Sequence, residues 1–167
     1  MNAVAIDNDS YRTVLARFPS GVTIVTASVD GRLFGLTVSA FSAVSLDPPL
    51  VLACVDNTSN TLPAVIESGR FTVNFLKDSA TETALRFASK DENKFSSIET
   101  RESATGPILE SEIVAYLCCH LDQVIEAGDH HVLLASVEEA EVWDSHEPLL
   151  YCDRKFQRAT HLEPQDQ

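Results

Sequence analysis

The chain has 167 residues, of which 44% are hydrophobic, 22% charged and 7% aromatic. This length and apolar fraction favour one globular domain over residues 1–167 and argue against a fibrous or largely disordered protein. The 25 acidic and 12 basic side chains give a formal net charge of −13. Such a charge repels phosphate backbones and anionic lipid, so nucleic-acid and membrane-surface roles are disfavoured.

Two features of the sequence predict a cytoplasmic protein. No stretch approaches the roughly 20 apolar residues of a membrane-spanning helix. Residues 1–10 are polar and lack the basic start and apolar centre of a signal peptide.

Each cysteine lies in an apolar run that is typical of a core strand, so we expect buried, reduced thiols. The four are Cys54, Cys118, Cys119 and Cys152.

The chain is expected to begin with a helix and then to change to strand periodicity. Asp9 or Ser10 can cap this helix, whose apolar residues recur at helical spacing up to Phe18. The dipeptide Asp30-Gly31 predicts a hairpin between two strands that are rich in β-branched and apolar residues. These strands are expected over residues 21–28 and 33–41.

The rest of the chain predicts further strands, two more short helices and one long loop. Asp47-Pro48-Pro49 interrupts any regular element, because two prolines remove two amide donors. Ser79 and Glu82 form a capping-box pattern at the start of a helix. The polar stretch over residues 90–107 predicts a long surface loop, a kind of segment that is often functional. We expect helices over about 61–68 and 79–88, and strands over 50–55, 71–76, 113–125, 131–143 and 149–152.

Six or more strands with few, short helices indicate a mainly β barrel or sandwich in one domain. The sequence contains no internal repeat and no second composition regime. The core is expected over about residues 11–158, with flexible termini, because the tail after Arg158 is polar.

Three polar segments are candidates for chemistry, and each also has an ordinary structural explanation. Thr37 and Ser39 share one face of a strand and either face solvent or form the floor for a flat polar ligand. Residues 57–61 precede a helix, where hydroxyls and free amides either cap the helix or bind an anion. His130 and His131 lie in a predicted turn and are either surface groups or catalytic groups that titrate near neutral pH.

Other kinds of site lack support in the sequence. Cys118 and Cys119 are adjacent and would point to opposite faces of a strand, so they cannot converge with His120 on one metal ion. We therefore expect no metal site. The sequence has no glycine-rich dinucleotide or phosphate loop, no nucleophile elbow and no HExxH helix. Any nicotinamide or flavin chemistry then requires a scaffold other than a Rossmann fold.

Several short segments follow one another in a specific order, namely residues 17–26, 35–41, 44–51, 68–74, Lys94-Phe95 and 128–130. This order resembles the flavin reductase family with the FMN-binding split-barrel fold. Members of that family are the reductase partners of two-component flavin-dependent monooxygenases. The resemblance covers Tyr11 to Arg158, and the ending at residues 151–156 is most similar to FMN-preferring members.

The resemblance implies a homodimer in which each chain forms a six-stranded antiparallel Greek-key barrel with a few short flanking helices. It also implies an NAD(P)H:flavin oxidoreductase that transfers hydride from NADH to FMN, or alternatively to FAD. The reduced flavin would diffuse to a separate monooxygenase. NADH is favoured over NADPH, because no arginine cluster is available for a 2′-phosphate.

Two alternatives to this activity stay open. One is a non-catalytic flavin-binding split barrel that acts as a carrier or sensor. The other is an oxidase of the pyridoxamine-phosphate type, which shares the fold but needs a more basic phosphate pocket than this sequence shows.

The family's flavin-contacting positions are carried over residue by residue. Those along the isoalloxazine edge are Thr37, Val38, Ser39 and Ala40, with Ser45, Leu46, Asp47 and Pro48 beside them. Those for the ribityl chain and phosphate are Cys54, Val55, Thr58, Ser59 and Thr61. A loop over the phosphate side supplies Ser89, Lys90, Lys94 and Phe95, and the chain end supplies Asp153 and Arg154.

Two further positions bear on the reaction. His130 matches a histidine near the nicotinamide, where it would hydrogen-bond the carboxamide or stabilise the reduced flavin. Asn57 stands where many relatives carry Arg or Lys, so one cation near the flavin phosphate is missing. Either Lys90 or Lys94 compensates, or the flavin binds more weakly, and weak binding suits a diffusible product.

Overall fold

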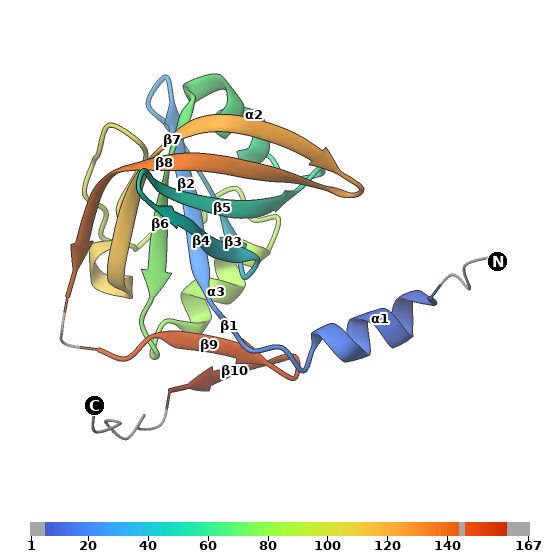
Figure 1. Cartoon of the computed structure of the whole chain (residues 1–167). Coiled ribbons are helices and arrows are strands. Elements are labelled where there is room, and N and C mark those ends of the chain that lie inside the picture. The colour runs from blue at the N-terminus through green and yellow to red at the C-terminus, as the bar shows by residue number, and fades with distance from the viewer. Residues whose placement is uncertain (1–5, 144–145, 160–167) are drawn as a thin grey trace.

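The computed structural model describes residues 6–143 and 146–159 and is built around an antiparallel sheet of seven strands (Figure 1). Neighbouring strands follow the order β3-β2-β6-β7-β8-β5-β4. Their bounds are β2 Thr23–Val29, β3 Arg32–Val38, β4 Phe41–Leu46, β5 Pro49–Asp56, β6 Arg70–Leu76, β7 Ile113–Ala127 and β8 His130–Val142. The expected mainly β fold is confirmed, whereas the chain ends expected to fray, residues 1–5 and 160–167, lie outside the described residues.

This sheet curls like a barrel and brings its two edge strands close together, but no strand pairing within the described residues joins the edges. β3 and β4 are its opposite edge strands, yet only Ser39 and Ala40 connect them along the chain. We call this connection, with the adjoining ends of β3 and β5, the seam. The Cys54 amide donates a hydrogen bond of 2.9 Å to the Ala40 carbonyl, which extends the β4–β5 ladder by one residue into this connection. The sequence predicted one strand over residues 33–41, but the chain leaves β2 after Val38 and pairs with β5 from Phe41 onward. This transfer is why the sheet has seven strands rather than six.

Two hydrophobic clusters lie on the two faces of the curled sheet. The inner cluster fills the barrel and includes Val25, Phe71 and Leu133, and the first half of α2 (Thr61–Ser68) packs into it. The outer cluster includes Ile24 and Phe87 and joins the sheet to α3 (Thr81–Ala88). Successive side chains of a strand point to opposite faces, so β2 is buried on both sides and supplies residues to both clusters.

A second, three-stranded sheet lies beside the barrel and has the order β1-β9-β10. Its bounds are β1 Ser20–Gly21, β9 Leu149–Cys152 and β10 Lys155–Arg158. The sequence predicted β9 but not β10. Asp153 and Arg154 connect the two strands, and both have positive φ angles, of 53° and 60°. Positive φ at both central residues is typical of a type I′ hairpin turn, but without a glycine this dipeptide was not recognised as one.

The residues that cap the starts of two helices differ from those predicted. α1 (Asn8–Leu15) is capped by Asp7, not by Asp9 or Ser10, because the Asp7 carboxylate accepts the Ser10 amide hydrogen bond at 2.9 Å. The capping box of α3 is also wrong, since its N-cap is Ala80 and Glu82 pairs instead with Arg86 at 3.3 Å.

The end of α2 and the predicted surface loop agree with expectation. α2 ends at Gly69 with a φ of 65°, and residues 90–107 contain no helix or extended strand. A three-residue 3-10 helix, Glu110–Glu112, follows. Within the described part of the chain, no helix is both long and apolar enough to cross a membrane.

Asn74 fastens the segment after the long loop to the sheet. Its side chain is fully buried in β6. The amide nitrogen donates to the Ile24 carbonyl at 3.2 Å and to the Thr26 hydroxyl at 3.1 Å, and the amide oxygen accepts from the Leu109 amide at 2.9 Å. A buried polar group without a partner is destabilising, so these three bonds act as one unit.

We expect Asn74→Ala to lower the free energy of unfolding by about 3 kcal/mol, because the buried Leu109 amide and Ile24 carbonyl lose their partner. Urea unfolding followed by circular dichroism measures this change. Asn93→Ala, at an exposed asparagine, is the matched control and should change stability by no more than about 0.5 kcal/mol. Equal stability of the two variants would contradict this account of Asn74.

Candidate active site

A cavity of about 500 Å³ opens beside the seam, between strand β3 and the end of strand β5. Three segments form its walls: residues 32–37 of β3, residues 56–61 at the start of α2, and residues 87–95 at the end of α3 and the following loop. The first segment is on the edge strand β3 and the second follows β5, the strand next to the other edge, so the cavity exists only because the sheet curls. Its volume lies within the roughly 300–1,000 Å³ of small-molecule sites.

The start of α2 presents hydroxyl groups to this cavity, whereas the amides of Ser59 and Leu62 already donate to carbonyls of the same segment. The Ser59 hydroxyl accepts a hydrogen bond of 3.1 Å from the Thr61 amide, so part of the segment is an ordinary helix cap. The Asp56 carboxylate accepts from both the Thr58 hydroxyl and the Thr58 amide at 2.6 Å. These bonds lower the pKa of Asp56 below its usual value. Hydroxyl groups and the helix dipole at a helix start attract anions, so this wall suits a phosphate despite the Asp56 charge.

The cation Lys94 fixes the loop that forms the third wall. Its ammonium group donates to the carbonyls of Gly35, at 3.1 Å, and Phe87, at 2.9 Å. Burial lowers the pKa of Lys94, and the charge of Asp91 opposes this shift. Lys94 therefore connects the loop to both β3 and α3.

The cavity is lined by equal numbers of positive and negative side chains, whereas the whole chain is strongly acidic. Three cationic side chains line it, namely Arg32, Lys90 and Lys94. Three carboxylates also line it, namely Asp56, Asp91 and Glu92. The cavity is thus locally neutral in a chain with a net charge of −13.

Gly35 allows an aromatic pair to lie directly on β3. A Cβ atom at Gly35 would lie 2.6 Å from a ring carbon of Phe87 and 3.1 Å from one of Phe95. The two rings pack edge to face with centroids 5.0 Å apart. This role of Gly35 was not predicted from the sequence, although a glycine inside a strand is a known signal of close approach. The lining residues Arg32, Phe34 and Asn60 were not predicted either.

Eight of the positions predicted to contact flavin line the cavity. They are Thr37, Thr58, Ser59, Thr61, Ser89, Lys90, Lys94 and Phe95. They come from all three walls, so the structure brings together segments that are distant in the sequence. The Thr37 hydroxyl, however, donates to the Ala84 carbonyl at 2.6 Å and anchors α3.

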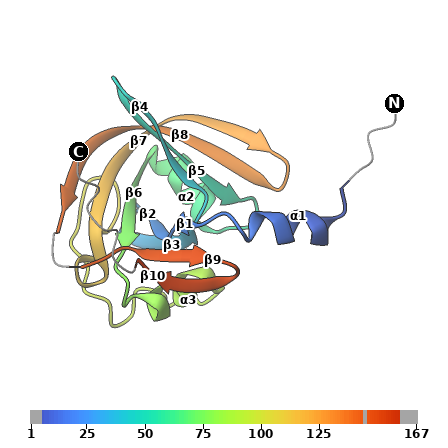
Figure 2. The same cartoon turned by 60° about the horizontal axis from the view of Figure 1, so that its bottom comes forward.

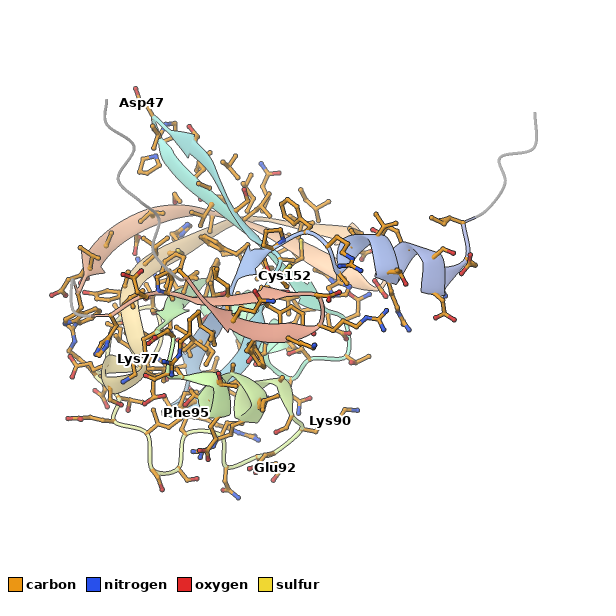
Figure 3. The ribbon with its side chains drawn as sticks, turned by 90° about the horizontal axis from the view of Figure 1, so that it is seen from below. Asp47, Lys77, Lys90, Glu92, Phe95 and Cys152 are labelled. Carbon is orange, nitrogen blue, oxygen red and sulfur yellow. The ribbon has the colours of Figure 1, made fainter. Side chains whose placement is uncertain are left out.

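Other predicted positions do not line the cavity of this single chain. Val38, Ser39, Ala40, Cys54 and Val55 lie at or beside the seam. Ser45, Leu46, Asp47 and Pro48 lie at the tip of the β4–β5 hairpin, which extends beyond the rest of the sheet (Figure 2). Figure 3 shows Asp47 and Lys90 at opposite ends of the molecule. Asp153 and Arg154 form the β9–β10 turn, where Asp153 lies 3.7 Å from Arg17.

His130 lies next to the cavity but does not line it. It begins β8 and pairs in register with Asp56, which is a lining residue. The His130 ring nitrogen Nδ1 lies 2.7 Å from the Asp129 carboxylate, and this hydrogen bond lowers the pKa of Asp129. The contact orients the ring and leaves Nε2 available. Asn57 also does not line the cavity, because its side chain contacts the β7–β8 turn.

The expectation of buried thiols holds for two of the four cysteines. Cys118 and Cys119 are buried, whereas Cys54 and Cys152 are half-buried. Burial raises the pKa of Cys119 to about 12. Among residues 6–143 and 146–159, no three His, Cys, Asp or Glu side chains are grouped to hold one metal ion.

Comparison with known proteins assigns the family. Residues 15–160 match the model of the flavin reductase like domain. The chain belongs to this family. It is 44% identical over 149 residues to a flavin reductase of Pseudomonas putida, which covers 88% of this chain and 87% of that protein.

Two further relatives carry more specific descriptions. One is the reductase subunit HsaB of a flavin-dependent monooxygenase from Rhodococcus jostii, 38% identical over 97% of this chain and 82% of that protein. The other is the structure of the Streptomyces globisporus NADH:FAD oxidoreductase SgcE6 in complex with NAD and FAD fragments. It has a TM-score of 0.86 and 30% identity, covering 95% of this flavin reductase-like chain and 98% of that one.

We expect Lys94→Met to release the loop over the cavity, because the carbonyls of Gly35 and Phe87 lose their shared donor. Chymotrypsin cleavage after Phe95 in the native protein should become at least about 5-fold faster, since local opening governs such cleavage. Lys90→Met is the matched control, because Lys90 is exposed and forms no side-chain hydrogen bond within the described residues. Equal cleavage rates in Lys94→Met and the unmodified protein would show that Lys94 does not hold the loop.

Proposed function

We propose that this protein is an NADH-dependent flavin reductase that reduces FMN and releases it to a separate flavin-dependent monooxygenase. The observation that carries this proposal is the cavity beside the seam in a chain of the flavin reductase family. The names of its relatives support both the reductase activity and the partnership with a monooxygenase.

The residues of the cavity fit a flavin mononucleotide. The hydroxyls of Thr58 and Ser59 and the positive end of the α2 dipole form a wall suited to the phosphate. Lys90 is exposed in the wall that follows α3, where its charge would attract an anion. Strand β3, with Gly35 near its middle, forms an extended wall that suits the ribityl chain and the ring system of the flavin. The size, the donor groups and the balanced charge of the cavity therefore agree with this ligand.

The protein's share of the reaction is alignment rather than covalent chemistry. When bound, the flavin supplies N5 as the acceptor of the hydride from nicotinamide C4. The loop held by Lys94 forms one wall of the cavity. His130, whose ring contacts Asp129, lies next to the cavity and is our candidate for the contact with the nicotinamide.

The charges that line the cavity favour NADH over NADPH and FMN over FAD as substrates. Arg32 is the one arginine among the lining residues, which is little for a 2′-phosphate, so NADH is favoured. FMN is favoured over FAD because the locally neutral cavity has few groups for a second phosphate and adenosine. The relative SgcE6 is an NADH:FAD oxidoreductase, so FAD is the alternative substrate. The same balance of charge suits modest affinity and release of the product.

Carboxylates in the cavity distinguish this proposal from an oxidase of the pyridoxamine-phosphate type. Asp56, Asp91 and Glu92 offset the three cations. A phosphate-bearing pyridoxal ligand that must be held tightly needs a more basic pocket. The non-catalytic carrier remains the main competitor of the reductase, and the assay below separates the two.

A homodimer is part of the proposal. Large apolar side chains are exposed on two projecting segments of the single chain. Leu46 at the β4–β5 tip is 94% exposed and Phe18 after α1 is 77% exposed. α1 stands away from the barrel in both ribbon views (Figures 1 and 2). A second copy that covers these segments removes this surface from water.

The cytoplasm is the proposed location of the protein. Its proposed electron donor, NADH, is a cytoplasmic metabolite, and its four cysteines are free thiols in the structure.

The direct test is the oxidation of NADH by the purified protein in air with excess free FMN. The reductase account predicts continuous NADH loss that depends on added flavin. No consumption with FMN or FAD, together with yellow protein after desalting, would favour the carrier instead.

His130→Ala should lower kcat/KM for NADH by about 10-fold, because the nicotinamide loses an oriented contact. The KM for FMN should change little, since the cavity walls stay intact. His120→Ala is the matched control, at an exposed histidine on β7. Unchanged kinetics in His130→Ala would remove His130 from the site.

Leu46→Asp should shift the protein from dimer to monomer, because a buried carboxylate at the interface lacks a partner. Light scattering after size-exclusion chromatography measures the mass. Leu85→Asp, at an exposed leucine of α3, is the control. A monomeric unmodified protein, or a dimeric Leu46→Asp variant, would contradict this interface.

A further inference from the structure

Asn57 joins the loop before α2 to the tip of the β7–β8 hairpin by three hydrogen bonds. Its backbone amide donates to the Asp129 carbonyl at 3.0 Å. Its side-chain nitrogen donates to the Gly128 carbonyl at 3.1 Å. Its side-chain oxygen lies 2.7 Å from Nδ1 of His131. Every polar group of this side chain is therefore directed at the turn that carries His130.

The bond to Gly128 determines the direction of the bond to His131. Because the amide nitrogen of Asn57 is a donor, its oxygen must be the acceptor. Nδ1 of His131 therefore carries a hydrogen. A short side chain that donates and accepts in one plane is specific to asparagine, since aspartate offers two acceptors and a lysine or arginine only donors.

The turn needs such a connection because little else holds it. Residues 122–129 of the β7–β8 hairpin are exposed. The connection itself is two residues long, and Gly128 has a φ of 67°. Hairpin tips without packing contacts open readily. Backbone pairing of β8 with β5 reaches Asp56 and His130, and Asn57 extends the connection by one residue into the turn.

We propose that Asn57 is a positioning residue that fixes His130 relative to the flavin cavity. This inference rests on the proposed function. Asp56, on one side of Asn57, lines the cavity and pairs with His130, and Thr58, on the other side, also lines the cavity. One side chain thus couples the wall suited to the phosphate to the histidine that serves the nicotinamide. Asn57 acts through His130 and does not touch the flavin.

Steady-state kinetics of Asn57→Ala test this role. Loss of two side-chain hydrogen bonds should raise the KM for NADH by about 5-fold, with less than about a 2-fold change in the KM for FMN. Gln123→Ala, at an exposed amide on β7, is the matched control. A rise in the KM for FMN alone would place Asn57 at the flavin and overturn the proposal, as would unchanged kinetics.

A double variant separates positioning from a general structural effect. If Asn57 acts through His130, adding Asn57→Ala to His130→Ala should cause no further loss of kcat/KM for NADH. Multiplied losses would contradict the proposal. His131→Phe removes only one of the side-chain bonds, so it should raise the KM for NADH less than Asn57→Ala does.

Nitrogen-15 NMR of the histidine rings tests the contact independently of activity. The unmodified protein should show His131 with its hydrogen on Nδ1, and Asn57→Ala should lose this signal. Absence of the signal from the unmodified protein would overturn the hydrogen-bonded contact. If the signal is present but no NADH is oxidised, the proposed function fails while the contact stands. If the signal is lost in Asn57→Ala without a kinetic change, the positioning role fails while the proposed function stands.

Discussion

The curling of the sheet depends on one tight connection, in which the chain passes from one sheet edge to the other through Ser39 and Ala40. Because only two residues connect the edge strands β3 and β4, the seven-stranded sheet has to curl, although no strand pairing within the described residues closes it. This curl gives the apolar face an interior, which the inner cluster and α2 fill. It also brings β3 beside the end of β5, two segments that no local pairing would join. The cavity is a direct consequence of this meeting.

The two sides of the seam, β3 and the end of β5, supply different groups to the cavity. β3 gives a wall with Gly35, where the absence of a Cβ lets the Phe87 and Phe95 rings approach the strand. The end of β5 gives Asp56 and the hydroxyls before α2. Because the chain carries a net charge of −13, long-range attraction cannot gather two anionic ligands. Local groups must do so, and their balanced charges suit a site that releases its product.

Much of the fold was predictable because its signals are local. Asp30-Gly31 made the β2–β3 hairpin and Gly69 ended α2, each through backbone preferences that neighbouring residues do not alter. The β9–β10 turn escaped prediction because Asp153 and Arg154 adopt positive φ without a glycine. The use of Lys94 as a loop anchor and of Asn57 as a contact to the turn depends on residues far along the chain, so no local pattern reveals either role.

The central claim is that the start of α2 receives the phosphate of a flavin bound beside the seam. FMN and riboflavin share the ring system and differ in this phosphate, so their KM values with NADH isolate its contribution. The account predicts a KM for riboflavin about 10-fold or more above that for FMN. Equal KM values for the two flavins would contradict the assignment of this wall to the phosphate.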